Sequence, residues 1–364
     1  MLPFSALFKS NRASRSLYSS LSFNPNFSSQ AYSLQSLFQP RREILFFLPM
    51  IPFWSVPLTP LLKSLRRFYS NNQWILIAFE SQREYTSIFP FFNQVISLPP
   101  IDPISIKEWT DFFQRFQPIA SSIFFSLNPF DVELSELLAS YSAAEIRINP
   151  FEYRNPTYHN LSLHAQEVKP ENLIQSLETR INTIYHHQLQ LEPLCYPFPR
   201  EIAKEAARFL ISLGYQTHQP LIVLNLQPDY EDMIPAFSQI LPVLNLIPDD
   251  HDPFIVVFCN DPSLQETISR KYPRWKILTE TPLWQSLAII ILSELFITTV
   301  DDRFSLSALF RRHSLVIARS RSQMNQCQAR QFQNHYFVNL SDLPHPITEV
   351  RQYILQQIHH PANS

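Results

Sequence analysis

The sequence predicts an α/β protein with two doubly wound parallel sheets. Short apolar runs such as 44–48 (ILFFL), 74–79 (WILIAF) and 254–259 (FIVVFC) have the length and residue types of strands that are buried on both faces. Segments with helical patterning separate these runs through both halves of the chain, which is the order of a βαβ fold. The length of 364 residues allows two domains of ordinary size.

The composition fits a globular chain without a nucleic-acid partner. Hydrophobic residues make up 45% of the chain and charged residues only 16%, so a sizeable core can form. The formal net charge is −2, so the overall basic character of a nucleic-acid-binding protein is missing. The three cysteines, Cys195, Cys259 and Cys327, are odd in number and far apart, which argues against a disulfide framework and fits a reducing compartment.

Glycine is almost absent. The chain contains one, Gly214, where average usage would give about 25. A dinucleotide fingerprint, a P-loop, a nucleophile elbow and a kinase glycine loop each need glycine for positive φ or for close approach of the backbone to phosphate. These four classes of site are therefore excluded.

Residues 1–42 differ from the rest of the chain. They contain eleven serines and five basic residues, and the first acidic residue of the chain is Glu43. We expect a disordered or surface-associated extension, and the alternative for this composition is an organelle transit peptide.

In the first half, strands alternate with helices. Thr59 is expected to cap the first helix, and Pro60 suits its first turn. Phenylalanine stripes on the later helices are expected to face the core. The expected strands are 43–48, 74–79, 94–98, 120–127 and 145–148, the expected helices are 61–69, 85–92, 106–116 and 132–141, and 149–163 is expected to be a loop.

The second half repeats this pattern after a long helix and a proline-rich linker. The helix at 201–213 is expected to end at Gly214, which suits the position after a helix. The apolar stretch 283–300 contains Glu294 and is expected to be a core helix followed by a strand, not a membrane span. The expected strands are 220–226, 254–259, 275–278, 295–300, 314–318 and 336–340, and the expected helices are 172–189, 201–213, 233–244, 263–272, 305–312 and 347–359.

The candidate binding site is the turn that follows the strand at 295–300. Asp301 and Asp302 stand at the carboxyl end of this strand, and Arg303 and Ser305 begin the next helical segment. Ligands of open α/β sheets bind beside the carboxyl ends of the strands. Aspartate before a helix is also a favoured N-cap, so Asp301 has a structural alternative.

Two regions resemble glycosyltransferase family 9, the ADP-heptose:lipopolysaccharide heptosyltransferases. In the first region, residues 59–62 (TPLL) and 65–67 (LRR) match the family's Thr-Pro-Leu-Leu helix start and its basic helix end. In the second, Asp301 falls on the family's motif aspartate and Ala308 on an alanine of the helix that follows.

The resemblance covers residues 43–350 in order and spacing. It implies a GT-B fold, in which two Rossmann-like domains face a cleft. It also implies that the first domain binds the acceptor and the second binds the nucleotide sugar. The expected domains are 43–192 and 201–346, joined by a linker at 193–200, with an extension at 1–42 and a C-terminal helix and tail at 347–364.

The sequence departs from the family where the chemistry should be. The family's Gly-Asp pair, which supplies its expected general base, falls on Phe53 and Trp54, and a tryptophan cannot accept a proton. The family's serine and glycine after the motif aspartate fall on Asp302 and Arg303, and its histidine falls on Leu306. Asp302 adds negative charge beside the expected diphosphate, which Arg303 offsets only in part. The family's phosphate-binding basic residue after the first strand of the second domain is replaced by the acidic residues Asp229, Glu231 and Asp232.

Several other polar groups have both a functional and a structural interpretation. Glu80 and Glu84 are alternatives for the lost base. The basic residues of two helices could bind phosphate or anionic lipid, or they could form solvated helix ends. They are Lys63, Arg66 and Arg67 in the first half and Arg303, Arg311, Arg312, Arg319 and Arg321 in the second.

No metal site and no cofactor are expected. The histidines that lie near one another in the sequence have no carboxylate or cysteine at a recognised ligand spacing. They are His159, His164, His186 and His187.

Two functions follow from these observations. The first is transfer of a sugar from a nucleotide-sugar donor, an ADP-sugar by resemblance, to a lipid-linked glycan acceptor of the lipopolysaccharide type. The second is a catalytically inactive pseudo-glycosyltransferase that acts as a binding or scaffold module. The expected donor-binding residues are Asp301, Asp302, Arg303 and Ser305, and the expected acceptor-side loop contains Phe53, Trp54, Ser55 and Thr59.

The expected compartment is the cytoplasm, with peripheral contact to the inner membrane and no transmembrane helix. Organelle targeting by residues 1–42 is the alternative.

Overall fold

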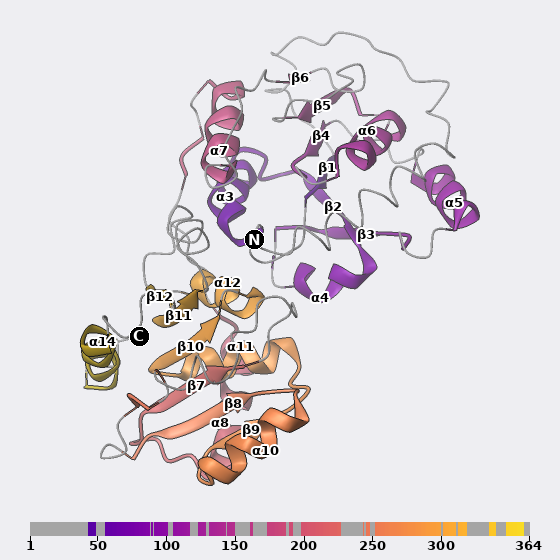
Figure 1. The fold of residues 1–364 in the computed structure, drawn as a ribbon. Helices are drawn as coiled ribbons and strands as arrows, with labels where there is room; N and C mark the ends of the chain where they lie inside the picture. Colours follow the sequence, from indigo (N-terminus) through magenta and orange to yellow (C-terminus); the bar gives the residue numbers. More distant parts are fainter. Residues whose placement is uncertain are drawn as a thin grey trace. The chain divides into compact units, whose positions relative to one another are not determined.

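The structure is a computed structural model of the 364-residue chain (Figure 1). The chain divides between Pro193 and Leu194 into two compact units, which we call the N-terminal and C-terminal units. The extension at 1–42 and most of the linker and of the helix at 233–244 lie outside the described residues. The structure describes residues 43–48, 55–87, 89, 91–100, 105–116, 123–128, 131–142, 144–149, 161–162, 173–186, 189–191, 198–226, 243, 245–247, 252–299, 301–310, 312–318, 335–339 and 347–359.

The N-terminal unit contains one parallel six-stranded sheet. Its strand order is β3-β2-β1-β4-β5-β6, which is the 3-2-1-4-5-6 order of the Rossmann fold. The order therefore reverses between β1 and β4. The strands are β1 (Glu43–Phe47), β2 (Gln73–Phe79), β3 (Gln94–Leu98), β4 (Ile123–Ser126), β5 (Ile146–Asn149) and β6 (Leu161–Ser162).

Both faces of β1 are buried because its side chains alternate between two apolar layers. Leu45 and Phe47 join the core formed with the helices α5 and α6. Phe46 points the other way and stacks on Trp74 and Phe125 at centroid distances of 4.4 and 4.9 Å.

The helices are α3 (Thr59–Phe68), α4 (Arg83–Thr86), α5 (Ile106–Phe116), α6 (Val132–Tyr141) and α7 (Leu173–Ile184), with 3₁₀ helices at Val56–Leu58 and Glu80–Gln82.

The phenylalanine stripes lie in the core, as predicted. Phe112, Phe113 and Phe116 on α5 are at most 5% exposed, and Phe89 and Phe91 are also buried.

Three local predictions were wrong in this unit. Thr59 does not cap α3, because a 3₁₀ helix precedes it and Thr59 already has helical φ and ψ of −55° and −42°. A capping residue needs an extended backbone. The helix expected at 85–92 is instead α4, which follows directly on a 3₁₀ turn at the end of β2 and stops at Thr86. The loop expected at 149–163 contains the short edge strand β6.

The C-terminal unit repeats this architecture with a second parallel sheet. Its order, β12-β11-β10-β7-β8-β9, is the same Rossmann order counted from β7. The order reverses between β7 and β10, which pair in parallel. The strands are β7 (Leu221–Asn225), β8 (Phe254–Phe258), β9 (Lys276–Leu278), β10 (Leu295–Thr299), β11 (Ser314–Ala318) and β12 (His335–Asn339).

Helices cover both faces of this sheet, so the predicted doubly wound fold class is confirmed for both units. Alternate residues of β7 divide between two apolar clusters, with Leu221 and Val223 packed against α8 and α11, and Ile222 and Leu224 on the side of α10 and α14. The helices are α8 (Arg200–Ser212), α10 (Pro262–Lys271), α11 (Leu283–Leu292), α12 (Asp302–Leu309) and α14 (Ile347–His359).

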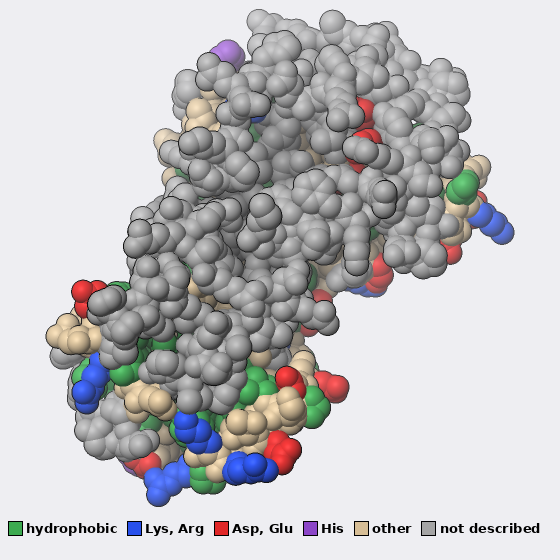
Figure 2. Space-filling view, in the orientation of Figure 1, with side chains coloured by type: hydrophobic (Ala, Val, Ile, Leu, Met, Phe, Trp, Pro, Cys, Tyr) green, Lys and Arg blue, Asp and Glu red, His purple; other side chains and the backbone are tan. Residues whose placement is uncertain are grey.

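The described part of the apolar stretch, residues 283–299, forms α11 followed by β10, as predicted. Among the helices that the structure describes, none is long and apolar enough to cross a membrane. On the face shown in Figure 2, basic and acidic side chains are intermixed around α10, where Arg270 pairs with Glu266 at 2.7 Å.

Gly214 ends α8 in a Schellman motif, as its position in the sequence predicted. The Tyr215 N–H donates to the Leu210 carbonyl, and the Gly214 N–H donates to the Ile211 carbonyl, both at 3.0 Å. The φ of Gly214 is +101°, and a Cβ built on it would meet nothing within 4 Å. Backbone strain is therefore the only cost of a side chain at this position.

We expect Gly214→Ala to lower the free energy of unfolding by about 1–2 kcal/mol, the cost of a left-handed L-residue. Urea denaturation followed by circular dichroism measures this change. The matched control is Ser212→Ala, at the exposed end of the same helix, which should leave the unfolding midpoint almost unchanged. Equal midpoints for both variants would contradict the strain argument.

Candidate functional site

Polar side chains meet at the point where the strand order of the C-terminal sheet reverses. Asn225 ends β7 and Thr298 lies near the end of β10, and both are buried. Asp301 follows β10 and is 3% exposed. Ligands of doubly wound sheets bind outside the carboxyl ends of the strands at this reversal, and the turn that the sequence predicts as a binding site lies there.

The Asp301 carboxylate holds the turn together. Its Oδ1 accepts a hydrogen bond from the Phe304 N–H at 2.7 Å, which makes Asp301 the N-cap of α12. Its Oδ2 accepts from Asn225 Nδ2 and lies 3.2 Å from Thr298 Oγ1. The capping interpretation of Asp301 is therefore confirmed, and both carboxylate oxygens have protein partners.

The other predicted donor-binding residues lie in the first turn of α12. The Ser305 hydroxyl is fully buried and donates to the Asp301 carbonyl oxygen at 3.1 Å. Arg303 is half-buried, and its guanidinium carbon lies 5.8 Å from the centroid of the Phe258 ring at the end of β8. Asp302 is the first residue of the helix, and its side chain lies outside the described part of the structure.

The two arginines near α12 that the structure describes lie at opposite ends of the helix. Arg303 lies at the start of the helix, on the carboxyl side of β10, whereas Arg312 follows the helix and precedes β11. Burial lowers the pKa of Arg312, and the nearby Glu294 opposes that shift. Glu294 in turn accepts a hydrogen bond from the Leu221 N–H at 2.6 Å. Arg312 and Glu294 are thus structural groups at the amino end of the sheet, and Arg311, Arg319 and Arg321 lie outside the described residues.

The predicted acceptor-side loop is described in part. Phe53 and Trp54 lie outside the described residues, as do the acidic residues Asp229, Glu231 and Asp232. Ser55 and Thr59 are fully buried around the 3₁₀ helix that follows β1. The Thr59 hydroxyl oxygen has no hydrogen-bond partner.

The basic residues of α3 include one with a clear structural role. Arg66 donates to the Asn72 carbonyl oxygen at 2.9 Å, and its guanidinium carbon lies 5.2 Å from the centroid of the Trp74 ring.

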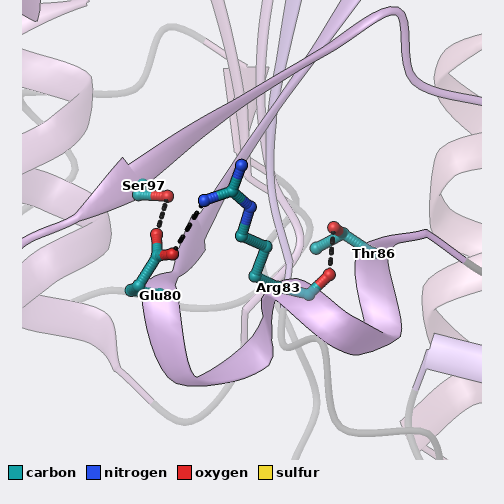
Figure 3. A network of polar contacts seen from close by, with 4 residues as sticks. All are labelled: Glu80, Arg83, Thr86 and Ser97. Carbon is teal, nitrogen blue, oxygen red and sulfur yellow. Dashed lines mark hydrogen bonds and ion pairs between the residues drawn. The ribbon is translucent and has the colours of Figure 1, made fainter. Parts of the chain in front are cut away.

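Glu80 is not placed as a general base would be. Figure 3 shows its carboxylate between Ser97 and Arg83, and the contact to Arg83 Nη1 measures 3.0 Å. The Ser97 hydroxyl and then Arg83 hold the pKa of this exposed carboxyl below its usual value. A lowered pKa makes a carboxylate a weaker proton acceptor, so this network favours a structural role at the ends of β2 and β3.

No metal centre is apparent in the described residues, where no three His, Cys, Asp or Glu side chains are grouped closely enough to hold an ion. His159, His164 and His187 are outside that part of the chain.

Two residues were missed by sequence reasoning. Asn225 is a polar residue at the end of an apolar run, and that break in the run was the available signal. Glu178 on α7 is a second, with 5% exposure. Its neighbours Leu177 and Ile181 predict a buried stripe on this helix. The local sequence does not show whether a glutamate beside such a stripe is itself buried or lies at the edge of the stripe.

No protein-family profile matches the sequence, and no curated protein matches it. Solved structures do match, at identities that show the fold alone. The glycosyl transferase family 9 protein from Veillonella parvula has a TM-score of 0.66 at 13% identity, covering 87% of this chain and 88% of that one. The E. coli ADP-heptose lipopolysaccharide heptosyltransferase II has a TM-score of 0.65 at 14% identity, covering 86% and 99%. The E. coli heptosyltransferase WaaC with ADP has a TM-score of 0.64 at 13% identity, also covering 86% and 99%. The fold is thus GT-B-like, that of the family 9 heptosyltransferases.

Proposed function

We propose that this protein is a GT-B nucleotide-sugar-binding protein that transfers the sugar to a glycan acceptor. The observation that supports it best is the polar turn where β7, β10 and the start of α12 meet, with the half-buried Arg303 beside it. The predicted donor-binding residues Asp301, Asp302, Arg303 and Ser305 all belong to this turn.

Different residues of the turn have different roles in this proposal. The N-terminus of α12 supplies backbone N–H groups and the positive end of a helix dipole, which attract a diphosphate. Arg303 supplies a planar, always charged group that can pair with two phosphate oxygens. Asp301 and Ser305 bond to protein groups and fix the shape of the turn.

An ADP-sugar is the first donor to test. The similar E. coli WaaC structures are described with ADP and with ADP-2-deoxy-2-fluoro heptose. On the acceptor side, we assign a lipid-linked glycan to the N-terminal unit, near the loop of Phe53, Trp54, Ser55 and Thr59. We place the reaction in the cytoplasm, at the surface of the inner membrane.

A second function, an inactive binding or scaffold module, is favoured by the replaced positions. Trp54 stands where a general base is expected, and Asp302 places a negative charge at the start of α12. In this case the nucleotide would still bind, but no sugar would be transferred.

We expect ADP to raise the melting temperature of the protein and Arg303→Ala to weaken that effect. At 100 times its dissociation constant a ligand adds about 2.7 kcal/mol to stability, and loss of a charged phosphate contact reduces affinity about tenfold to a hundredfold. Thermal shift with ADP, UDP and ADP-sugars measures both effects. The matched control is Arg270→Ala on α10, whose side chain is 79% exposed and pairs with Glu266. If ADP-sugars and free nucleotides leave the wild-type melting temperature unchanged at millimolar concentration, the proposal fails.

A transfer assay separates the two functions. Release of ADP from an ADP-sugar in the presence of a lipid A-core acceptor supports the transferase, whereas nucleotide binding without release supports the inactive module.

A further inference from the structure

Arg303 and Phe258 come from different elements and meet at the carboxyl edge of the C-terminal sheet. Arg303 is the second residue of α12, which follows β10, and Phe258 is the last residue of β8. In the sheet, β7 lies between β8 and β10 and pairs with both, so these two strands are about 10 Å apart. The Arg303 guanidinium carbon nevertheless lies 5.8 Å from the centroid of the Phe258 ring. The contact therefore spans the carboxyl end of β7, where the strand order reverses.

The Phe258 side chain is held firmly in place. It is fully buried in an apolar cluster with residues of α8 and α11. The Phe258 carbonyl oxygen accepts a hydrogen bond at 2.9 Å from the N–H of Leu226, the residue directly after β7. Phe258 also pairs in register with Asn225, the residue of β7 that bonds to Asp301. The ring thus belongs to the same edge of the sheet as the polar turn.

Contact with this ring restricts the Arg303 side chain. A guanidinium within about 6 Å of a ring centroid is attracted by the negative face of the ring. Such a contact needs none of the N–H donors of the guanidinium, so it can orient the charge without using them. Arg303 is half-buried, and an arginine whose rotamers are already restricted loses less entropy when it binds a phosphate.

The positive charge of Arg303 lies in the same turn as a second source of positive potential. The first turn of α12 presents backbone N–H groups and the positive end of the helix dipole. A ligand that fits both groups carries two or more negative charges close together, as a diphosphate does.

We propose that Phe258 is a positioning residue of the nucleotide site, whose ring holds the Arg303 guanidinium in the orientation that binds the diphosphate. This inference rests on the proposed function, because that function places a nucleotide at the turn after β10. It adds a residue from β8, which lies 43 residues before the motif aspartate Asp301 and does not touch the ligand itself.

The test is a double-mutant cycle on nucleotide affinity. Isothermal titration calorimetry on the full chain measures binding of ADP, or of UDP if the wild type binds UDP instead. Phe258→Met removes the ring but keeps most of the apolar volume, and we expect it to weaken binding about fivefold. Arg303→Ala should weaken binding about tenfold to a hundredfold. Once Arg303 is alanine, the ring has no charge to hold, so adding Phe258→Met should weaken binding less than twofold further.

The matched control is Phe296→Met on β10. Phe296 is fully buried in the same apolar cluster as Phe258, so both methionine variants should lower the urea midpoint of unfolding by similar amounts. Nucleotide affinity should nevertheless stay at the wild-type value in Phe296→Met, because Phe296 lies near the start of its strand and not at the carboxyl edge.

Three results would overturn the role of Phe258 and leave the proposed function in place. The first is a nucleotide affinity of Phe258→Met within twofold of the wild type. The second is a double variant in which the two single losses multiply, and the third is an equal loss in Phe296→Met. The last two would show that the ring acts only through the stability of the fold. If the wild type binds neither ADP nor UDP, the proposed function fails, and this inference fails with it.

Discussion

At pH 8.5 we expect the Glu178→Gln variant to be more stable than the wild-type protein. Burial raises the pKa of the Glu178 carboxyl to about 7 in the folded state, whereas a glutamate in an unfolded chain has a pKa near 4.3. At pH values between about 4.3 and about 7, the Glu178 carboxyl therefore keeps its proton in the folded state but has released it in the unfolded state. Above pH 7 the folded state must keep a charge in an apolar environment, and glutamine removes that cost.

The direction of the pH dependence follows from these two values. A raised folded-state pKa stabilises the fold fully below the unfolded pKa of about 4.3, and this contribution is lost as the pH rises through about 7. Between pH 5 and pH 8.5 the free energy of unfolding of the wild type should fall by about 2.5 kcal/mol more than that of the variant. In a unit of this size that corresponds to roughly 5–10 °C in melting temperature.

Urea denaturation at pH 5 and pH 8.5, followed by tryptophan fluorescence, measures this difference. The matched control is Glu108→Gln on α5, an exposed glutamate of the same unit, and its effect on the free energy of unfolding should be the same at both pH values. If the advantage of Glu178→Gln is the same at pH 5 and pH 8.5, Glu178 is not buried as the structure shows.

Asp301→Ala is expected to destabilise the C-terminal unit by about 2–4 kcal/mol. Loss of the N-cap of α12 accounts for about 1 kcal/mol. The rest arises because the variant removes an acceptor from the buried Asn225 amide, and a buried donor without an acceptor costs about 1–3 kcal/mol. Urea denaturation monitored by circular dichroism measures the total.

The N-cap of α10 provides the matched control. Asp261 accepts hydrogen bonds from the Ser263 and Leu264 N–H groups, but its side chain is exposed and its described hydrogen bonds are all to residues of the same helix start. Asp261→Ala should therefore cost clearly less than Asp301→Ala. Equal losses would show that the contact with Asn225 adds nothing beyond the cap.

This result also decides how the nucleotide site should be probed. Asp301→Ala disturbs the turn itself, so loss of ADP binding in that variant would not identify a ligand contact. Arg303 makes a better probe, because its side chain is half-buried beside Phe258 and caps no helix.

Much of the fold could be predicted because strand and helix patterns are local. The boundaries of α5, α6, β3, β11 and α14 agree with the sequence-based ranges. The errors fall where two local signals compete. Thr59 and Pro60 resemble a helix start, but a 3₁₀ helix already begins at Val56, so Thr59 is the first residue of α3 and Leu58 takes the capping position.

The turn after β10 could be proposed as a site from the sequence, but the contacts of its residues could not. The sequence by itself determined two βα series, the end of α8 at Gly214 and an aspartate after β10, because each depends on neighbouring residues. Only the tertiary structure showed that Asn225 meets Asp301 across 76 residues of sequence. It also placed Arg303 and Arg312 at opposite ends of α12, and it buried Glu178 on α7. Burial, and with it the pKa of a side chain, depends on segments that are distant in the chain, and no local pattern records which segments those are.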